Sequence, residues 1–228
     1  TGDDLMNAEI AGELQPYLSR RGYNMPVYQC SSSGVRHKVH ADKVVQHSIY
    51  TPELLCSDTI DRMAMVLNQS YCGSGTLREN WLNCDYFSRM SSRASADFAV
   101  SLLHSAGVSI SEALERWEPQ GELLENLAKT EHLRWCAFHY SMGFRPMSQE
   151  EFHHRAEVYR REAADTGVGK IRISKDLNQR IHACLVPWDQ LDALSARENA
   201  ITGKNTDYKE MDRNNVRAIP NVLRAMEE

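Results

Sequence analysis

The sequence predicts a mainly α-helical protein in which two related helical units follow a small α/β segment. The first observation is a pattern that occurs twice, as AMVLNQSY at residues 64–71 and as AKTEHLRW at residues 128–135. Under this offset of 64 residues, Ala64 corresponds to Ala128, Asn68 to His132 and Tyr71 to Trp135. The second observation is the helical spacing of apolar residues from residue 52 onwards. Because an internal repeat determines the architecture of a chain, we expect repeats at about 57–110 and 122–228.

Residues 1–55 form the predicted α/β segment. Apolar residues recur at helical spacing over residues 4–21, and Gly22 is a suitable stop. Residues 25–30 and 44–50 are short apolar runs that predict two strands. One helix and two strands are too little to close a doubly wound sheet. We therefore expect either an appendage to the helical part or a piece of a larger α/β domain.

Turn residues divide the following chain into helices. Gly73 and Gly75 break the first helical stretch, Ser92 can cap the helix that Gly107 ends, and Gly143 ends the longest periodic run. The predicted helices are residues 59–71, 77–87, 93–106, 111–117, 123–142, 149–164, 188–194 and 207–226, the last interrupted by Pro220. Two stretches are predicted to lack helix, a basic, exposed one at residues 170–180 and a connection at residues 196–206.

Composition excludes several classes of protein. The 228 residues carry a formal net charge of −5 at pH 7, which disfavours non-specific binding of DNA or RNA because that requires a basic surface. The 6 cysteines include no Cys-x-x-Cys pair, which is typical of reduced thiols in the cytoplasm rather than of disulfides or a zinc site. No run approaches the roughly 18 consecutive apolar residues of a membrane span, and no signal peptide is recognisable. We therefore expect a cytoplasmic protein or the soluble part of a membrane-associated one.

The densest group of functional side chains is Glu131-His132-Leu133-Arg134-Trp135. On a helix, His132, Trp135, Cys136 and His139 share one face because of their spacing. In one interpretation His132 and Trp135 line a pocket, where the indole stacks on a planar ligand and His132 or Glu131 supplies hydrogen bonds. In the other, His132 is a core histidine with satisfied hydrogen bonds beside a core tryptophan. The sequence leaves both interpretations open.

Arginine and asparagine side chains add a second group of candidates. The arginines that can donate to phosphate are Arg93, Arg134, Arg213 and Arg217. Ser92 and Asp212 are expected at helix starts, where anions are favoured. Capping and surface salt bridges are the alternative explanation of these residues. Asn214 and Asn215 lie in an early helical turn although Asn is a poor helix former, so we expect their amides to bond a ligand or another domain.

Metal binding and catalysis lack a complete set of residues. His132, Cys136 and His139 have no further ligand at an expected spacing. Cys136 beside His132 lacks the third group that would orient a nucleophile–base pair. The glycines at residues 73–75 and 167–169 are too few for a phosphate loop. We therefore predict no metal, no cofactor and no enzymatic activity.

Longer stretches resemble a known family. LAKTEHLRWCAFHYSMGF, RIHACLVPWDQL and DYKEMDRNNVRAIPNVL resemble the second half of a ryanodine-receptor (RyR) domain of the bacterial type. IDRMAMVLNQSY and ENWLNCDYFSRMSSRASADFAVSLLHSAG resemble its first half. The resemblance covers about residues 57–228 and implies a helical domain with pseudo-twofold symmetry. Asn68 stands where His is common and Ser92 where Asn is common, and the segment 149–178 is longer and more polar than the usual linker.

The N-terminal stretch DDLMNAEIAGELQPYLSRRGYNMPVYQC resembles the late helix and strand of a TrkA-type Rossmann domain, which in bacteria often precedes an RyR domain. The glycine-rich first turn of such a domain is absent, so the resemblance implies no NAD site here. It implies that residues 1–55 are the C-terminal part of a Rossmann-like domain and residues 56–228 an RyR domain.

The RyR resemblance implies a non-catalytic sensor. RyR domains of animal channels are cytosolic regulatory modules. Bacterial ones look like sensors of nucleotide-derived second messengers, such as a cyclic oligonucleotide or an ADP-ribose derivative. They would act on an effector domain or a membrane channel in antiphage defence, within a homo-oligomer. The implied ligand-binding residues are Tyr71, Trp81, Trp135 and Trp188 for stacking, Arg93, Arg134 and Arg213 for phosphate, Ser92 at a helix start, and Glu131, His132 and Asn214 for base or sugar edges. The alternative is a protein-interaction or oligomerisation scaffold without a small-molecule ligand, in which the same residues form the core and the polar seam between the repeats.

Overall fold

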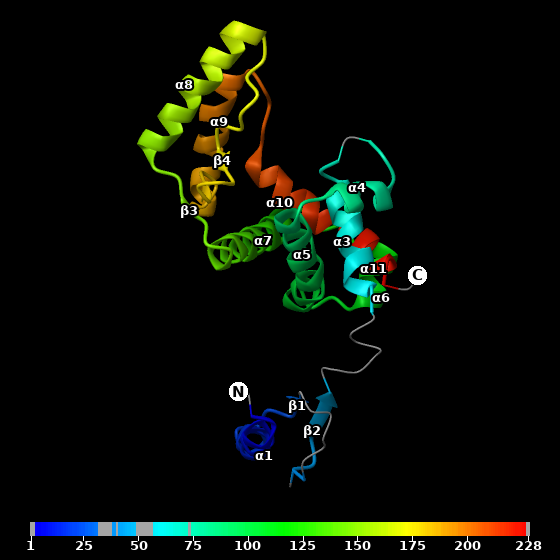
Figure 1. Cartoon of the computed structure of the whole chain (residues 1–228). Coiled ribbons are helices and arrows are strands. Elements are labelled where there is room, and N and C mark those ends of the chain that lie inside the picture. Colours follow the sequence, from blue (N-terminus) through cyan, green and yellow to red (C-terminus); the bar gives the residue numbers. More distant parts are fainter. Residues whose placement is uncertain (1–2, 32–37, 40, 49–56, 73, 227–228) are drawn as a thin grey trace. The chain divides into compact units, whose positions relative to one another are not determined.

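The computed structural model describes residues 3–31, 38–39, 41–48, 57–72 and 74–226 (Figure 1). The chain separates into two compact units, Thr1–Asp58 and Thr59–Glu228. The sequence placed this boundary after residue 55. We describe each unit by itself.

The first unit has one helix and a two-stranded sheet. Helix α1 (Asp4–Arg20) begins after Asp3, whose carboxylate accepts a hydrogen bond from the backbone N–H of Met6 at 2.9 Å. Strands β1 (Val27–Ser31) and β2 (Val44–Ser48) pair in parallel. The predicted order of helix, strand and strand is confirmed. The end of the second predicted strand, at Tyr50, lies outside the described residues.

The second unit is mainly helical, as predicted. Its elements are α3 (Thr59–Gln69), α4 (Leu77–Asn83), α5 (Tyr86–Ser105), α6 (Ile110–Arg116), α7 (Gly121–Ser141), α8 (Gln149–Thr166), the 3₁₀ turn η1 (Trp188–Gln190), α9 (Leu191–Thr202), α10 (Tyr208–Arg217) and α11 (Ile219–Arg224). The predicted interruption at Pro220 separates α10 from α11 because proline lacks the N–H that a continuous helix needs. No helix among the described residues is long and apolar enough to cross a membrane.

The main core of this unit lies among α3, α5, α7, α10 and α11, with one residue each from α4 and α6. Helix α3 packs on α5, α7 packs on α10, α5 contacts α7, and α11 contacts α3. Ala64 on α3, Ala96 on α5 and Ala128 on α7 are fully buried. Side chains this small let helix backbones approach closely. A smaller core joins α8, α9 and the segment between them. Its buried residues are Phe152, Ala156, Tyr159, Ile173 and Ala183.

The helix start predicted at Ser92 is wrong. Helix α5 begins at Tyr86, and the carboxylate of Asp85 caps it by accepting the N–H of Ser88 at 2.8 Å. The predicted helix 77–87 therefore ends early, at Asn83, because Asp85 starts a new helix. Ser92 lies in the second turn of α5 and is 8% exposed. It is an internal side chain and does not cap a helix.

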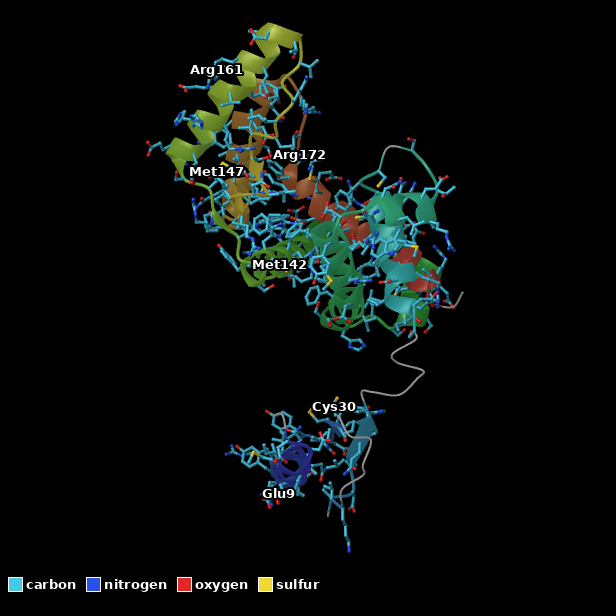
Figure 2. All side chains as sticks on the ribbon, in the orientation of Figure 1. Glu9, Cys30, Met142, Met147, Arg161 and Arg172 are labelled. Carbon is cyan, nitrogen blue, oxygen red and sulfur yellow. The ribbon has the colours of Figure 1, made fainter. Side chains whose placement is uncertain are left out.

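The stretch 170–180 is more ordered than its composition indicates. Ile173 is buried, and β4 (Lys175–Asp176) pairs with β5 (Ile181–His182), which also pairs with β3 (Arg145–Pro146). Arg155 of α8 donates to the backbone carbonyls of Arg172 and Lys175 at 2.7 and 2.6 Å (Arg172 is labelled in Figure 2). The expectation of a wholly exposed stretch is wrong because a distant arginine side chain fixes this backbone.

The predicted connection at residues 196–206 is also wrong over its first half. Helix α9 continues to Thr202 and ends at Gly203, which has a φ of 68°. Buried Ser195 and Glu198 are polar, so the inner face of α9 has no apolar periodicity at this point. The helix is stabilised by contacts that local hydrophobicity does not reveal.

Candidate ligand-binding site

Helix α7 positions the predicted cluster of functional side chains. Leu124, Leu127 and Ala128 anchor its first half in the main core. Glu131 and His132 follow one turn later on the same face and are 1% and 3% exposed. The helix therefore carries charged groups directly into the junction with α5 and α10.

Glu131 is the centre of a buried hydrogen-bond network. Arg134 donates to both of its carboxylate oxygens, with Nε–Oε2 and Nη2–Oε1 distances of 2.8 and 2.9 Å. Ser95 of α5 donates to Oε1 at 2.9 Å, and Asn215 of α10 donates to the same oxygen at 3.4 Å. Charge-assisted bonds of this kind are the stronger ones in proteins. Glu131 thus ties three helices together.

Arg134 keeps one donor unused. Its side chain is only 10% exposed, and within the described part of the chain its buried Nη1 atom has no hydrogen-bond partner. A buried donor without an acceptor is unfavourable by about 1–3 kcal/mol. Asn215 links this network to Tyr71, whose hydroxyl donates to the Asn215 Oδ1 atom at 3.1 Å. Tyr71 is 62% exposed, so an aromatic ring at the surface is connected to the network that contains the unused donor.

His132 belongs to a second buried network. Its Nδ1 lies 3.3 Å from the Asp212 carboxylate and its Nε2 lies 2.9 Å from the Val186 carbonyl. Both ring nitrogens face acceptors, which favours the doubly protonated imidazolium. Burial lowers the pKa of His132, but Asp212, Cys136 and the Val186 carbonyl together outweigh it and raise the pKa to about 10. Burial raises the pKa of the Asp212 carboxyl, against the effect of His132.

Trp135 packs among imidazole rings. Its ring centroid lies 5.9 Å from that of His132 in a stacked arrangement and 3.8 Å from that of His139. His182 meets it edge-on at 4.8 Å. His139 is 2% exposed, and burial lowers its pKa to about 4. The indole therefore lies within a mainly neutral aromatic cluster next to the charged His132.

The other two predicted stacking residues differ in burial. Trp81 is 5% exposed, and the guanidinium carbons of Arg89 and Arg93 lie 5.7 and 5.6 Å from its ring centroid. Trp188 is half-buried, with the Lys209 ammonium 5.3 Å from its ring centroid. Both indoles contact cations of the protein itself, and Trp81 is part of the main core.

All four predicted phosphate-binding arginines form ion pairs within the protein, including Arg134 with Glu131 and Arg217 with Glu210. Arg93 donates to both oxygens of Asp61 at 2.5 and 2.8 Å. Arg213 donates to both oxygens of Glu125 at 2.6 and 3.1 Å. This geometry corresponds to the salt-bridge alternative that the sequence left open. Asn214 is exposed and accepts from Arg217 at 2.9 Å.

An ion pair between α3 and α5 recurs between α7 and α10, and several buried positions correspond. Positions correspond at the offset of 64 residues for α3 and α7, and at the 120 residues that separate Arg93 from Arg213 for α5 and the two helices α10 and α11. The pair Asp61–Arg93 then corresponds to Glu125–Arg213. The buried residues that correspond are Asn68 with His132, Ser92 with Asp212, Ala96 with Val216, Ala99 with Ile219 and Leu103 with Leu223. Two cation–π contacts are similar in kind, Arg89 over Trp81 and Lys209 over Trp188; the two cations are 120 residues apart, but the two indoles are 107 residues apart.

The space between these helices is small. A cavity of about 10 Å³ lies against Glu131, Ser95 and Asn215 and is closed by apolar side chains of α3, α5 and α11. That is room for at most a single water. Among the described residues, no group of three His, Cys, Asp or Glu side chains could hold a metal ion. A nucleotide therefore does not fit into this cavity.

Sequence reasoning left Ser95, Asp61 and Glu125 out of the candidate residues. Asp61 and Glu125 are separated by the same 64 residues as the repeated pattern, which could have identified them as equivalent partners. Ser95 carries no signal in the sequence, because its contact with Glu131 joins residues 36 positions apart.

Comparison of the chain with protein-family models, with curated proteins and with solved structures gives no match. The geometry within the chain is therefore the basis for assigning a function.

Proposed function

We propose that the second unit is a non-catalytic sensor that binds a nucleotide-derived second messenger, a cyclic oligonucleotide or an ADP-ribose derivative. The observation that carries the proposal is the unused, buried Nη1 donor of Arg134 in the network that leads to the exposed ring of Tyr71. The ligand supplies the missing acceptor and stacks on the tyrosine ring. Stacking of a base on an aromatic side chain contributes roughly 1–3 kcal/mol.

The proposal includes an RyR-type domain built from two repeats. The resemblance of residues 57–228 to bacterial RyR domains supports it, and so does the ion pair that recurs at offsets of 64 and 120 residues. In this proposal α3 with α5 and α7 with α10 are equivalent helix pairs. Pro220 divides the last helix of the second repeat into α10 and α11.

The chemistry of Arg134 indicates which ligand atoms it can bind. Glu131 already balances the charge of the guanidinium through two hydrogen bonds. The free donor can therefore serve a neutral acceptor, such as a base carbonyl or a ribose hydroxyl, as well as a phosphate oxygen. Arg93 and Arg213 also have carboxylate partners but, within the described residues, no buried nitrogen without a hydrogen bond, so we assign them to the stability of the fold.

Binding would regulate an effector on the same or another chain. A ligand can shift a conformational equilibrium only by its difference in affinity for the two states. Ordering of Tyr71 and Asn215 around the ligand would change the contact of α10 with α7, since Asn215 is on α10 and bonds Glu131 on α7. We propose an effector domain or membrane channel in bacterial antiphage defence as the regulated partner.

The test is a thermal-shift and calorimetric titration of the whole chain. The panel contains cyclic di- and trinucleotides, cyclic ADP-ribose isomers, ADP-ribose, NAD and ATP. A ligand at 100 times its dissociation constant stabilises a protein by about 2.7 kcal/mol, which gives a clear shift in melting temperature. The proposal expects at least one such ligand, and a flat panel with folded protein would contradict it.

Two variants locate the site. Tyr71→Ala removes the stacking ring from an exposed position, so we expect a folded protein with affinity reduced about tenfold or more. Arg134→Lys keeps a cation for Glu131 but removes the Nη1 donor, and we expect a similar loss. The matched control is Tyr86→Ala, because Tyr86 is also exposed, at 70%. Unchanged binding by both site variants would mean that the ligand lies elsewhere.

The alternative function is a protein-interaction or oligomerisation scaffold without a small-molecule ligand. The observation in its favour is the row of exposed apolar side chains on α1, including Ile10 and Leu14 at 50% and 41% exposure. A flat ligand panel together with self-association of the chain would support this alternative.

A further inference from the structure

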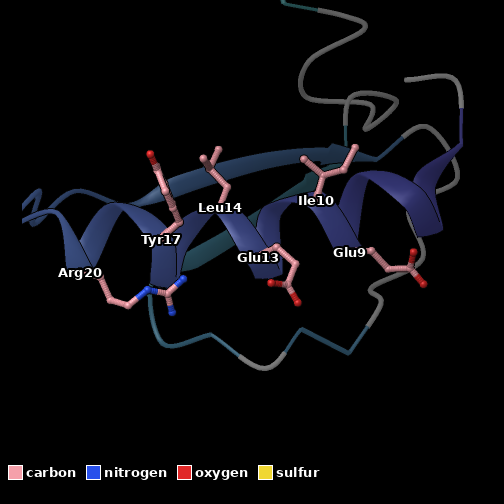
Figure 3. Close-up of a pocket in the computed structure, with 6 residues that line it drawn as sticks. All are labelled: Glu9, Ile10, Glu13, Leu14, Tyr17 and Arg20. Atoms are coloured by element: carbon pink, nitrogen blue, oxygen red, sulfur yellow. The ribbon is translucent and has the colours of Figure 1, made fainter.

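Helix α1 carries its largest apolar side chains on its outer face. The inner face packs on the strands through buried Ala8, Ala11 and Gln15. On the opposite face, Met6, Ile10, Leu14 and Tyr17 form one stripe and are 50%, 50%, 41% and 48% exposed. Figure 3 shows Ile10, Leu14 and Tyr17 on one side of the helix. A contiguous apolar surface of this kind is typical of a contact with another molecule.

Charged side chains run along one edge of this stripe. Glu9 and Glu13 lie toward the start of α1 and Arg20 lies at its end, and the three point to the same side in Figure 3. Together with Ile10, Leu14 and Tyr17 they line a shallow groove of about 540 Å³. In the described part of the chain, none of these three charges forms an ion pair. One half of the edge is therefore acidic and the other half basic.

When the helix is reversed, the acidic end of this edge meets the basic end twice, and the two Glu13 side chains meet near the centre. A twofold axis between Ile10 and Tyr17, near Leu14, sets Ile10 of one copy opposite Tyr17 of the other. Glu9 then lies within one helical turn of Arg20 of the second copy, because the helix rises about 1.5 Å per residue. A parallel arrangement would instead place the charged edges of the two helices on opposite sides of the contact, so Glu9 would not meet Arg20. Interfaces with twofold symmetry use the same patch on both subunits, so they require this kind of self-complementarity.

We propose that α1 is a dimerisation helix that binds α1 of a second copy in antiparallel orientation. Tyr17 and Met6 supply the side chains that are enriched in protein interfaces, and the edge charges set the orientation. The proposal concerns the first unit and does not depend on ligand binding by the second. It assigns a surface, a symmetry and a register to self-association of the chain.

Sedimentation velocity of the whole chain over a range of concentrations tests the surface. We expect a monomer–dimer equilibrium that Leu14→Asp shifts to the monomer, with the dissociation constant raised about tenfold or more. The matched control is Leu82→Asp, since Leu82 is an apolar residue of α4 with 64% exposure. Circular dichroism checks that each variant is folded. A monomer at all concentrations, or a dimer that Leu14→Asp leaves intact, would overturn the proposal.

A charge exchange tests the orientation. Glu9→Arg and Arg20→Glu should each weaken the dimer, because each sets like charges against one another across the twofold axis. The double variant Glu9→Arg/Arg20→Glu restores opposite charges and should recover the original dissociation constant. Failure of the double variant to recover would exclude the antiparallel register. Binding of the wild-type chain to acidic lipid vesicles, with no dimer in solution, would assign the stripe to a membrane instead and overturn the proposal.

Discussion

Helix pair α3–α5 and helix pair α7–α10 make corresponding contacts, but they differ in what they bury. Both have an ion pair at the edge, Asp61–Arg93 and Glu125–Arg213. Inside, the first pair buries the neutral side chains Asn68 and Ser92. At the corresponding positions the second buries His132 and Asp212, which lie 3.3 Å apart.

The difference teaches that one packing arrangement can hold either a neutral or a charged interior. The charged version is held by several further contacts. His132 needs Asp212 and the Val186 carbonyl, and the neighbouring Glu131 needs Arg134, Ser95 and Asn215. The unused donor of Arg134 lies in this half of the molecule. In the function that we propose, the charged half supplies the groups that recognise the ligand.

The largest effect should follow when one partner of the buried pair is removed. Asp212→Ala leaves the His132 imidazolium without its carboxylate, and breaking a buried ion pair is unfavourable by about 3–5 kcal/mol. Ser92→Ala, at the corresponding position of α5, removes only a hydroxyl and should change the unfolding free energy by less than about 1.5 kcal/mol. Urea denaturation of both variants measures the two changes. Equal losses would mean that the two helix pairs do not differ in this way.

The double variant His132→Asn/Asp212→Ser sharpens the same comparison. It installs the Asn68 and Ser92 side chains in the second pair, so no buried charge remains unpaired. Replacing both partners of a buried pair is often close to neutral. We therefore expect most of the stability lost in Asp212→Ala to return. A double variant as unstable as the single one would show that the two interiors are not interchangeable.

A smaller effect should appear in the pH dependence of stability. The folded pKa of His132 is about 10, against an ordinary value of 6.5. The stability that this shift provides is complete below about pH 6.5 and is lost as the pH rises toward 10, by about 1.4 kcal/mol per pH unit at most. His139 acts in the opposite direction. Its pKa of about 4 means that stability is lost as the pH falls from 6.5 toward 4.

Urea unfolding between about pH 4 and pH 9 measures both slopes. As far as these two histidines are concerned, the wild-type chain should be most stable near pH 6.5, because both losses begin there. The His132→Asn/Asp212→Ser variant should lose the alkaline slope and keep the acidic one, because His139 is unchanged. If the stability of this variant still decreased at alkaline pH, the decrease would have to come from a group other than His132.

The smallest effect concerns the two ion pairs at the edges. Arg93 and Asp61 are 34% and 27% exposed, and Arg213 and Glu125 are 20% and 43% exposed. Solvent screens such pairs, so each should contribute about 0.2–1 kcal/mol. Double-mutant cycles with Arg93→Gln and Asp61→Asn, and with Arg213→Gln and Glu125→Gln, measure the two coupling energies. We expect similar values that decrease at high salt, and a much larger value in one pair would contradict their equivalence.

Local sequence patterns predicted much of the fold. The helix at residues 121–141 followed from apolar spacing and Gly143, and the break between α10 and α11 from Pro220. The start of α5 was missed because Asp85 and Ser92 are both of a residue type that caps helices. The prediction used Ser92, whereas the helix begins after Asp85. The ordered backbone at residues 170–176 depends on Arg155, which lies in another helix.

The candidate site was predicted less completely. The sequence identified the cluster of Glu131, His132, Arg134 and Trp135, and the structure places all four on one stretch of α7. It could not say which arginine keeps a free donor. Arg93 and Arg213 have partners 32 and 88 positions away along the chain, whereas Arg134 has one three positions away that uses only part of its guanidinium.

The sequence by itself therefore determined the helical class and most helix positions, and it singled out a set of polar and aromatic candidate residues. These depend on interactions between residues a few positions apart, which spacing and capping residues record. Tertiary structure alone decided which of those residues are satisfied inside the protein and which retain hydrogen-bonding capacity. It also decided that α1 turns its alanines inward and its large apolar side chains outward. Both outcomes depend on segments far apart in the chain, because a buried polar group needs a partner wherever the fold can supply one.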